Sequence, residues 1–99
     1  MGESNIAFKL PKAKYPTPDS VRVWYKAAVE EALYESGHYP YNGTISTTRG
    51  INFLYDTFTD EGLAEDYALD RSEKWGNMGC VTLKVGDKEY WIISGWAAS

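Results

Sequence analysis

The sequence predicts an α+β domain built on a small, mostly antiparallel sheet of about five strands, with two helices packed on one face. Three observations lead to this prediction: an amphipathic helical repeat in the first half, a two-residue β-hairpin near the end, and short alternating segments between them. The expected order is strand, helix, strand, strand, helix, strand, strand, which suits an antiparallel sheet with its helices on one side.

The size and composition of the chain fit one domain over residues 1–99. A chain of 99 residues buries roughly 60 to 65% of its unfolded surface, which is enough for one core. A hydrophobic content of 43% and a charged content of 24% are typical of an ordered globular protein. We therefore expect a single folded unit.

The first predicted element is a short edge strand over residues 6–10. Ile6, Phe8 and Leu10 recur at every second position, which is the pattern of a strand with one buried face. Pro11 then ends the run, because proline lacks the N–H group that a sheet ladder needs.

The second element is a helix over residues 18–36. Thr17 can cap its free N–H groups, and the proline that follows suits the first helical position. Apolar residues from Val21 to Leu33 recur at spacings of three and four, and Gly37 supplies the stop. This pattern predicts an amphipathic helix with one continuous apolar stripe.

Two strands are predicted in the middle of the chain, after a connection rich in turn-forming residues. Residues 44–49 are mostly β-branched, and residues 51–55 alternate with Ile51, Phe53 and Tyr55 on one apolar face. The break at Gly50 fits either a hairpin or one continuous bulged strand.

A second helix is predicted over residues 60–75. Thr59 is the expected cap, and Gly76 follows the expected end. The apolar stripe of this helix is narrow, so we expect a surface helix with one buried face. Its expected members are Leu63, Tyr67, Leu69, Arg71 and Trp75.

The C-terminal hairpin is the clearest element of the sequence. Gly86 and Asp87 form a two-residue turn between alternating segments, and the register that follows places Lys84 opposite Glu89. The segment 90–93 is apolar on both faces. We therefore expect it near the middle of the sheet, or with its outer face covered by a helix or a partner.

The cysteine content favours the cytoplasm. Cys80 is the only cysteine, whereas small secreted domains usually carry several disulfides. No apolar run approaches the ~20 residues of a membrane span, and the N-terminus lacks a signal-peptide pattern. Cys80 itself, at the start of a strand, is interpreted as a packing residue rather than a nucleophile.

The sequence contains few residues or motifs that are typical of catalysis or of metal binding. His38 is the only histidine and stands in a turn context, where a solvated side chain is ordinary. One cysteine and one histidine exclude the usual Cys/His zinc sites, and no phosphate-binding loop or EF-hand spacing is present. We therefore expect no catalytic residue, no metal and no cofactor.

Negative charge concentrates in the second half of the chain. Residues 51–99 hold four basic and nine acidic groups, whereas residues 1–50 hold six and five, so direct binding to nucleic acid is not expected. Half of the fourteen acidic groups lie in or just before the second helix, where they form either a solvated face or a docking surface for a basic partner. They are Asp56, Asp60, Glu61, Glu65, Asp66, Asp70 and Glu73.

Aromatic residues are the second excess, at 15% of the chain. Tyr34, Tyr39 and Tyr41 flank the end of the first helix and the loop after it, where amphipathic rings make good interface anchors. Trp91 and Trp96, on the hairpin, are further candidates for such contacts.

These patterns predict a non-enzymatic protein-binding module. It would be an inhibitor or adaptor that occludes a basic surface, such as one that binds nucleic acid, for example an anti-defence protein of a phage or mobile element. No membrane contact is expected, and homodimerisation stays open. The predicted partner-binding residues are Glu61, Glu65, Asp66, Asp70, Glu73, Tyr34, Tyr39, Tyr41 and Trp91.

The alternative is a small enzyme or ligand-binding domain with a polar pocket around His38 and Arg49. Thr44, Ser46, Thr48 and Asn52 would add polar groups to that pocket, and the first three share one strand face. Exposed strand faces carry such residues commonly, so the pattern also fits an ordinary surface.

Overall fold

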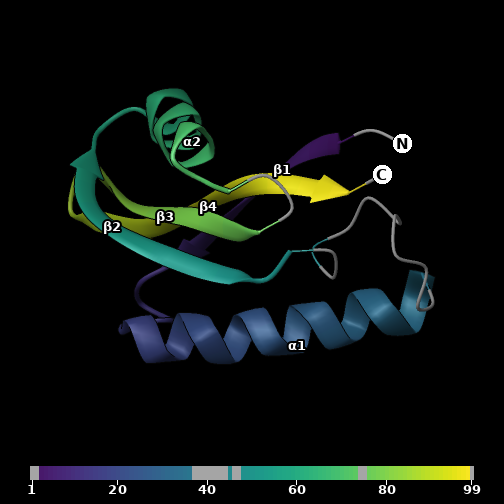
Figure 1. Cartoon of the computed structure of the whole chain (residues 1–99). Coiled ribbons are helices and arrows are strands. Elements are labelled where there is room, and N and C mark those ends of the chain that lie inside the picture. The colour runs from purple at the N-terminus through teal and green to yellow at the C-terminus, as the bar shows by residue number, and fades with distance from the viewer. Residues whose placement is uncertain (1–2, 37–44, 46–47, 74–75, 99) are drawn as a thin grey trace.

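The residues that the structure describes fold into one four-stranded sheet between two helices (Figure 1). The computed structural model describes residues 3–36, 45, 48–73 and 76–98. Its strands are β1 (Glu3–Pro11), β2 (Gly50–Phe58), β3 (Asn77–Val85) and β4 (Lys88–Ala98), and its helices are α1 (Pro18–Ser36) and α2 (Glu61–Asp70). The spatial order of the strands is β1-β4-β3-β2. The sheet is mixed, because β2 runs parallel to β3 while the other two pairs are antiparallel.

The predicted C-terminal hairpin is confirmed in register, and its strands extend beyond the predicted pairs, back to Asn77 and on to Ala98. All six expected pairs form, from Cys80 opposite Ile93 to Val85 opposite Lys88. Gly86 in the turn has a φ of 64°, a left-handed value that glycine adopts without steric cost. β4 lies between β3 and β1, so the prediction that this doubly apolar strand lies inside the sheet is also confirmed.

The two helices cover opposite faces of the sheet, so the expectation of helices on one face is wrong. Figure 1 shows α1 below the sheet and α2 above it. The physical reason is that β3 and β4 send apolar side chains to both faces, and each face needs a cover. The α1 side buries Leu10, Val21, Ile45, Met78, Cys80, Trp91 and Ile93. The α2 side buries Ala64, Ala68, Val81, Leu83 and Ile92.

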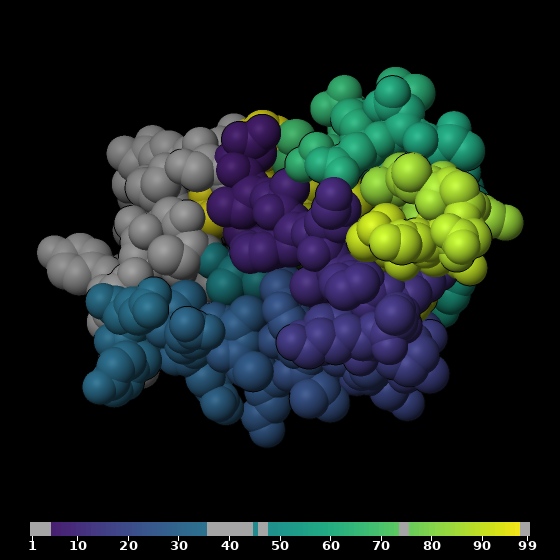
Figure 2. Space-filling model, turned by 180° about the vertical axis from the view of Figure 1, so that it is seen from behind, coloured from purple at the N-terminus to yellow at the C-terminus, as the bar shows by residue number. Residues whose placement is uncertain are grey.

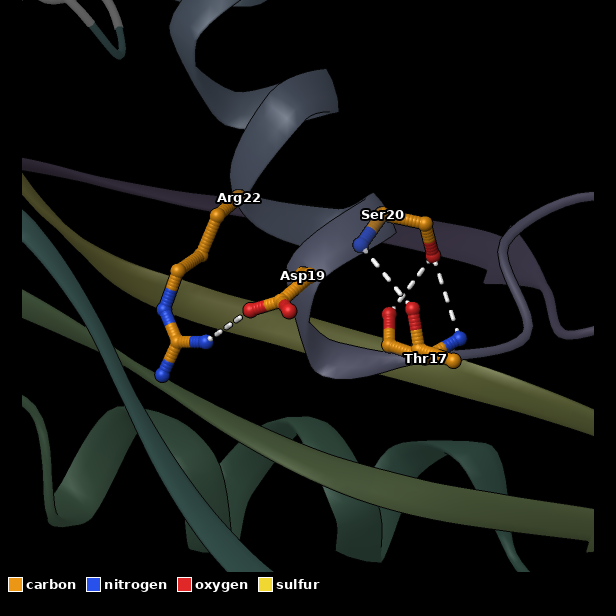
Figure 3. A network of polar contacts seen from close by, with 4 residues as sticks. All are labelled: Thr17, Asp19, Ser20 and Arg22. Atoms are coloured by element: carbon orange, nitrogen blue, oxygen red, sulfur yellow. Dashed lines mark hydrogen bonds and ion pairs between the residues drawn. The ribbon is translucent and has the colours of Figure 1, made fainter.

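The first helix begins at a reciprocal capping arrangement (Figure 3). The Thr17 hydroxyl accepts a bond from the Ser20 N–H at 3.2 Å, and the Ser20 hydroxyl accepts one from the Thr17 N–H at 3.1 Å. Asp19 pairs with Arg22 at 2.9 Å one turn further on. The predicted cap and the predicted span of residues 18–36 are therefore confirmed.

The predicted strand over residues 44–49 is not found at the positions described within it. Thr48 closes a tight turn instead: its N–H and its hydroxyl both donate to the Ile45 carbonyl oxygen, at 3.0 and 2.6 Å. Such local side-chain bonds compete with sheet ladders. Ile45 is buried against the α1 core. This turn accounts for a four-stranded sheet where about five strands were expected.

The second strand of the chain is irregular. β2 follows β3 in register up to Phe53 opposite Cys80 and resumes at Thr57 opposite Thr82, so β2 has a bulge between these pairs. Tyr55 in the bulge has a φ of 60° and is 76% exposed. It was expected to share an apolar face with Ile51 and Phe53, but the bulge turns it outward.

The second helix is shorter than predicted and rests on different residues. Asp60, not Thr59, caps it by accepting the Leu63 N–H at 3.0 Å. Ala64 and Ala68 are its fully buried residues, whereas Leu63, expected in the apolar stripe, is 61% exposed. Small side chains let the backbone of α2 approach β3 closely. Trp75, the other end of the predicted stripe, lies outside the described residues.

Candidate docking surface

Four carboxylates follow the exposed side of α2 from its first turn to its last residue. We call Glu61, Glu65, Asp66 and Asp70 the acidic face of α2. The helix can carry so many charges because its contact with the sheet is made by Ala64 and Ala68, which are fully buried, and by Tyr67 beside them. Like charges four positions apart repel by a few tenths of a kcal/mol per pair, so this spacing is mildly unfavourable for the isolated domain.

Glu61 ties the start of α2 to the edge strand β1. Its carboxylate accepts a hydrogen bond from Lys9 Nζ at 2.9 Å. This hydrogen bond, with the charge attraction, raises the pKa of Lys9. Both side chains are about half exposed, so the pair orients Lys9 more than it stabilises the fold.

A groove runs between β1 and α2. The residues that line it are Asn5, Ile6, Ala7, Gly62, Glu65, Asp66, Leu69 and Ser94. Its charged groups are the carboxylates of Glu65 and Asp66. The sequence did not predict that β1 lines a groove beside α2, although the alternation of residues 6–10 had indicated an edge strand.

The outer half of the acidic face borders a second hollow around the C-terminal end of α2. Asp66 and Asp70 line it together with apolar side chains, among them Leu63, Leu69 and Trp96. Leu63, which the sequence pattern had assigned to the buried face of the helix, is exposed. Carboxylates beside exposed apolar groups are a combination suited to binding a protein.

The carboxylates of Glu65, Asp66 and Asp70 lack an ionic partner among the residues described. The ion pairs found there join Lys9 to Glu61, Lys12 to Glu89 and Arg22 to Asp19. Arg71, which follows the last residue of α2 and lines the same hollow as Asp66 and Asp70, instead lies over the Tyr67 ring, with its guanidinium carbon 3.8 Å from the ring centroid. The negative potential of this face is therefore only partly offset.

Glu73 does not belong to the same surface. Its Oε2 accepts a bond from Asn52 Nδ2 at 3.5 Å, and Asn52 Oδ1 in turn accepts one from Asn77 Nδ2 at 3.1 Å. The Glu73 N–H also donates to the Asn77 carbonyl at 2.8 Å. These contacts place Glu73 beside the first residues of β2 and β3, in the connection that follows α2.

Trp91 is a core residue, so its predicted role as an exposed anchor is wrong. It is 6% exposed, and its indole N–H donates to the Tyr15 carbonyl at 2.6 Å. Phe53 meets its ring edge-on at 5.8 Å, and Lys12 Nζ lies 4.2 Å from the ring centroid. The sequence pattern missed this because β4 is covered on both faces.

The tyrosines and the acidic face are not brought together. Tyr34 is 92% exposed near the end of α1, on the opposite side of the sheet from α2. Tyr39 and Tyr41 lie outside the described residues, as does His38. A single partner surface that combines α2 with Tyr34 is thus not formed by this fold.

One residue of the alternative polar pocket, Thr48, is buried, and its hydroxyl is hydrogen-bonded within the fold. The Thr48 hydroxyl is 2.6 Å from that of Tyr25 and is buried. Arg49 is exposed, and its N–H donates to the Gly76 carbonyl at 2.9 Å. Thr44 and Ser46 lie outside the part of the chain that the structure describes.

Cys80 is unsuited to nucleophilic chemistry. It is 1% exposed, and burial raises the pKa of its thiol from 9.0 to about 12, an effect that the charge of Lys12 only partly opposes. The interpretation of Cys80 as a packing residue is confirmed. Within the described ranges, no group of three or more acidic, cysteine or histidine side chains is arranged to hold a metal ion.

A helix long and apolar enough to cross a membrane does not occur in the described parts of the chain. Comparisons of the whole chain with protein-family models, with curated proteins and with solved structures found no match.

Proposed function

We propose that this chain is a non-enzymatic protein-binding module that docks a partner with a basic surface on the acidic face of α2. The observation that carries the proposal is the exposure of Asp66 and Asp70 without an ionic partner among the described residues, beside the apolar groups of Leu63 and Trp96. A cationic partner would relieve the repulsion along the helix and cover these apolar groups.

The module would act by occlusion, as an inhibitor or an adaptor. Basic protein surfaces commonly bind nucleic acid, and an acidic domain seated on one would compete with the phosphate backbone. A cytoplasmic phage or mobile-element protein that blocks a host machine is one setting for such an activity. The buried thiol of Cys80 agrees with a binding role rather than a catalytic one.

The experiment is affinity capture from a lysate of the source cells with three forms of the protein. Asp66→Lys/Asp70→Lys reverses the outer acidic face. Glu30→Lys/Glu31→Lys makes the same change of net charge on the exposed side of α1 and is the matched control. We expect one basic protein to be retained by the wild type and the control, and to be reduced at least about tenfold on the α2 variant.

Capture should also weaken between low and high salt, because exposed charges are screened beyond roughly 10 Å at 0.1 M ionic strength. Equal retention by all three forms would show that the acidic face of α2 is a solvated surface without a docking role. Loss of capture in the α1 control alone would move the binding site to the opposite side of the sheet.

A further inference from the structure

We propose that the outer edge of β1 accepts an extended segment of the partner as an added strand, whose alternate side chains are basic toward α2 and apolar toward α1. This inference rests on the proposed function and names the chemistry of the partner. Addition of a strand to an exposed sheet edge is a common mode of peptide recognition, in which backbone bonds give affinity and alternate side chains give specificity.

Along one side of β1, the backbone groups have no partner strand among the residues that the structure describes. The Lys12 N–H donates to the Glu89 carbonyl at 2.9 Å, immediately beyond the ladder that joins β1 to β4. Bonded and non-bonded pairs alternate in an antiparallel ladder, so the even-numbered residues of β1 bond β4. Asn5, Ala7 and Lys9 therefore direct their N–H and C=O groups away from the sheet.

This edge is accessible and regular. Figure 2 shows the purple residues of β1 at the surface, between α2 above and α1 below. The other edge of the sheet is β2, whose bulge at Tyr55, with a φ of 60°, interrupts the ladder. Bulges protect edge strands from further pairing. Of the two edges, β1 is the one that a straight strand fits.

The groove between β1 and α2 sets the chemistry on one side of the added strand. The side chains of Asn5 and Ala7 line it from β1, and Glu65 and Asp66 line it from α2. Side chains of an added strand on this face would enter the space beside the two carboxylates, which lack ionic partners among the described residues. Lysine or arginine at every second position satisfies them.

The face of β1 toward α1 favours apolar side chains in the added strand. Ile6 and Phe8 point toward α1 and are only partly buried, and Phe8 meets the Trp24 ring edge-on at 5.2 Å. Apolar side chains of an added strand would extend this cluster. The partner segment therefore alternates basic and apolar residues.

A second copy of the chain fits this edge less well. Two-fold pairing of β1 with β1 would set both α2 helices on the same face of one joined sheet. Each copy would bring the carboxylates of Glu65 and Asp66 to the shared groove, whereas Lys9 beside it is already paired with Glu61. The resulting excess of negative charge favours a basic partner over self-association.

The test is fluorescence anisotropy with a labelled seven-residue peptide of alternating lysine and valine, titrated with the full chain. Ala7→Pro removes an outward N–H without removing a bond to β4, as prolines at sheet edges do. Glu65→Lys reverses a groove charge, and Glu31→Lys makes the same change on α1 as its control. We expect the first two to weaken peptide binding at least about tenfold, and the control to change it less than about twofold.

The peptide itself supplies a test that does not depend on the folding of Ala7→Pro. Two versions are methylated at alternate backbone nitrogens, in opposite phases. Only one side of an added strand bonds β1, so one version should lose binding at least about tenfold while the other keeps it. Sensitivity to Glu65→Lys with no effect of Ala7→Pro or of either methylation would overturn strand addition and leave the proposed function standing.

Three further outcomes contradict the inference. If the wild type does not bind the peptide, the alternating segment is not the ligand of this edge. If light scattering shows a dimer that Ala7→Pro converts to a monomer, a second copy occupies the edge. If peptide binding occurs but neither Glu65→Lys nor Ala7→Pro weakens it, both this inference and the docking role of α2 fail.

Discussion

The thiol of Cys80 is enclosed in the middle of the sheet, with Phe53 beside it on β2 and Ile93 beside it on β4. The surrounding apolar side chains remove it from water, and this desolvation is the main reason that its pKa rises to about 12. Burial also raises the pKa of Tyr25, although the hydrogen bond with Thr48 opposes the change. Both groups hold their protons more tightly when the chain is folded.

The stability of the fold should therefore fall in alkali. Below pH 9.0, the ordinary pKa of the thiol, Cys80 is protonated in both states and its contribution is fully present. As the pH rises through the window up to about 12, the unfolded chain releases the proton first, so unfolding becomes easier. Cys80 alone should cost about 1 kcal/mol by pH 10.

Urea unfolding at pH 7 and pH 10, with the wild type and Cys80→Ala, measures this effect. Cys80→Ala is less stable at both pH values, but its free energy of unfolding should fall less between them. Parallel losses in the two proteins would mean that the thiol does not carry the alkaline instability.

The burial of Trp91 could not be predicted from the sequence pattern around it. Its burial depends on the Tyr15 carbonyl that accepts its indole N–H, and the two are 76 positions apart along the chain. Leu63 shows the reverse error, because its spacing matched an apolar stripe although alanines make the contact with the sheet. Cys80, whose neighbours alternate in a clear strand, was interpreted correctly. Local patterns identify a buried strand better than they identify the buried side of a helix rich in charges.

At the scale of elements, two neighbouring residues, Thr59 and Asp60, are candidates for the cap of α2, and substitutions can distinguish them. Asp60→Ala removes the bond to the Leu63 N–H and should lower the free energy of unfolding by about 1 kcal/mol. Thr59→Ala, at the cap position expected from sequence, should change it by less than ~0.5 kcal/mol. Thermal unfolding of the two variants makes the comparison, and a larger loss from Thr59→Ala would place the helix start one residue earlier.

The packing of α2 on the sheet depends on the absence of a side chain at Gly79. A Cβ at this position would overlap the carbonyl oxygen of Ala68, which is backbone and cannot turn away. Gly79→Ala should therefore cost about 1 to 3 kcal/mol by forcing α2 off β3. Chemical unfolding measures the loss.

Gly62→Ala is the matched control for that substitution. It adds the same methyl group on the exposed side of α2, where its nearest contact is a carboxylate oxygen of Asp60 at 3.3 Å. It should cost less than ~0.5 kcal/mol, because alanine also favours the helical backbone. If the two substitutions have equal effects, the close contact between α2 and β3 is not a source of stability.

The elements that could be predicted are those whose signals are local. The span of α1, its Thr17 cap and the register of the β3–β4 hairpin follow from capping residues, a glycine turn and strict alternation. The faces on which the helices lie could not be assigned in the same way. They depend on β3 and β4 being apolar on both sides together, a property that was noticed for residues 90–93 only.

At the scale of the whole molecule, the sheet divides the surface into two regions with different chemistry. The α2 side carries the acidic face and the groove beside β1, whereas the α1 side carries exposed Val23 and Tyr34. The sequence predicted the acidic residues of the candidate site but not their separation from the tyrosines. That separation arises because α1 and α2 cover opposite faces of one sheet (Figure 1).

The most direct measurement of the proposed docking role is the binding site of a basic probe on the protein in solution. In ¹H–¹⁵N correlation spectra of the labelled full chain, titration with hexalysine should shift the amides of Glu61–Asp70 and those of neighbouring β1. The shifts should reverse on addition of salt, because the attraction is electrostatic. Shifts confined to α1 around Glu30 and Glu31, or spread evenly over the molecule, would contradict the assignment of α2 as the docking surface.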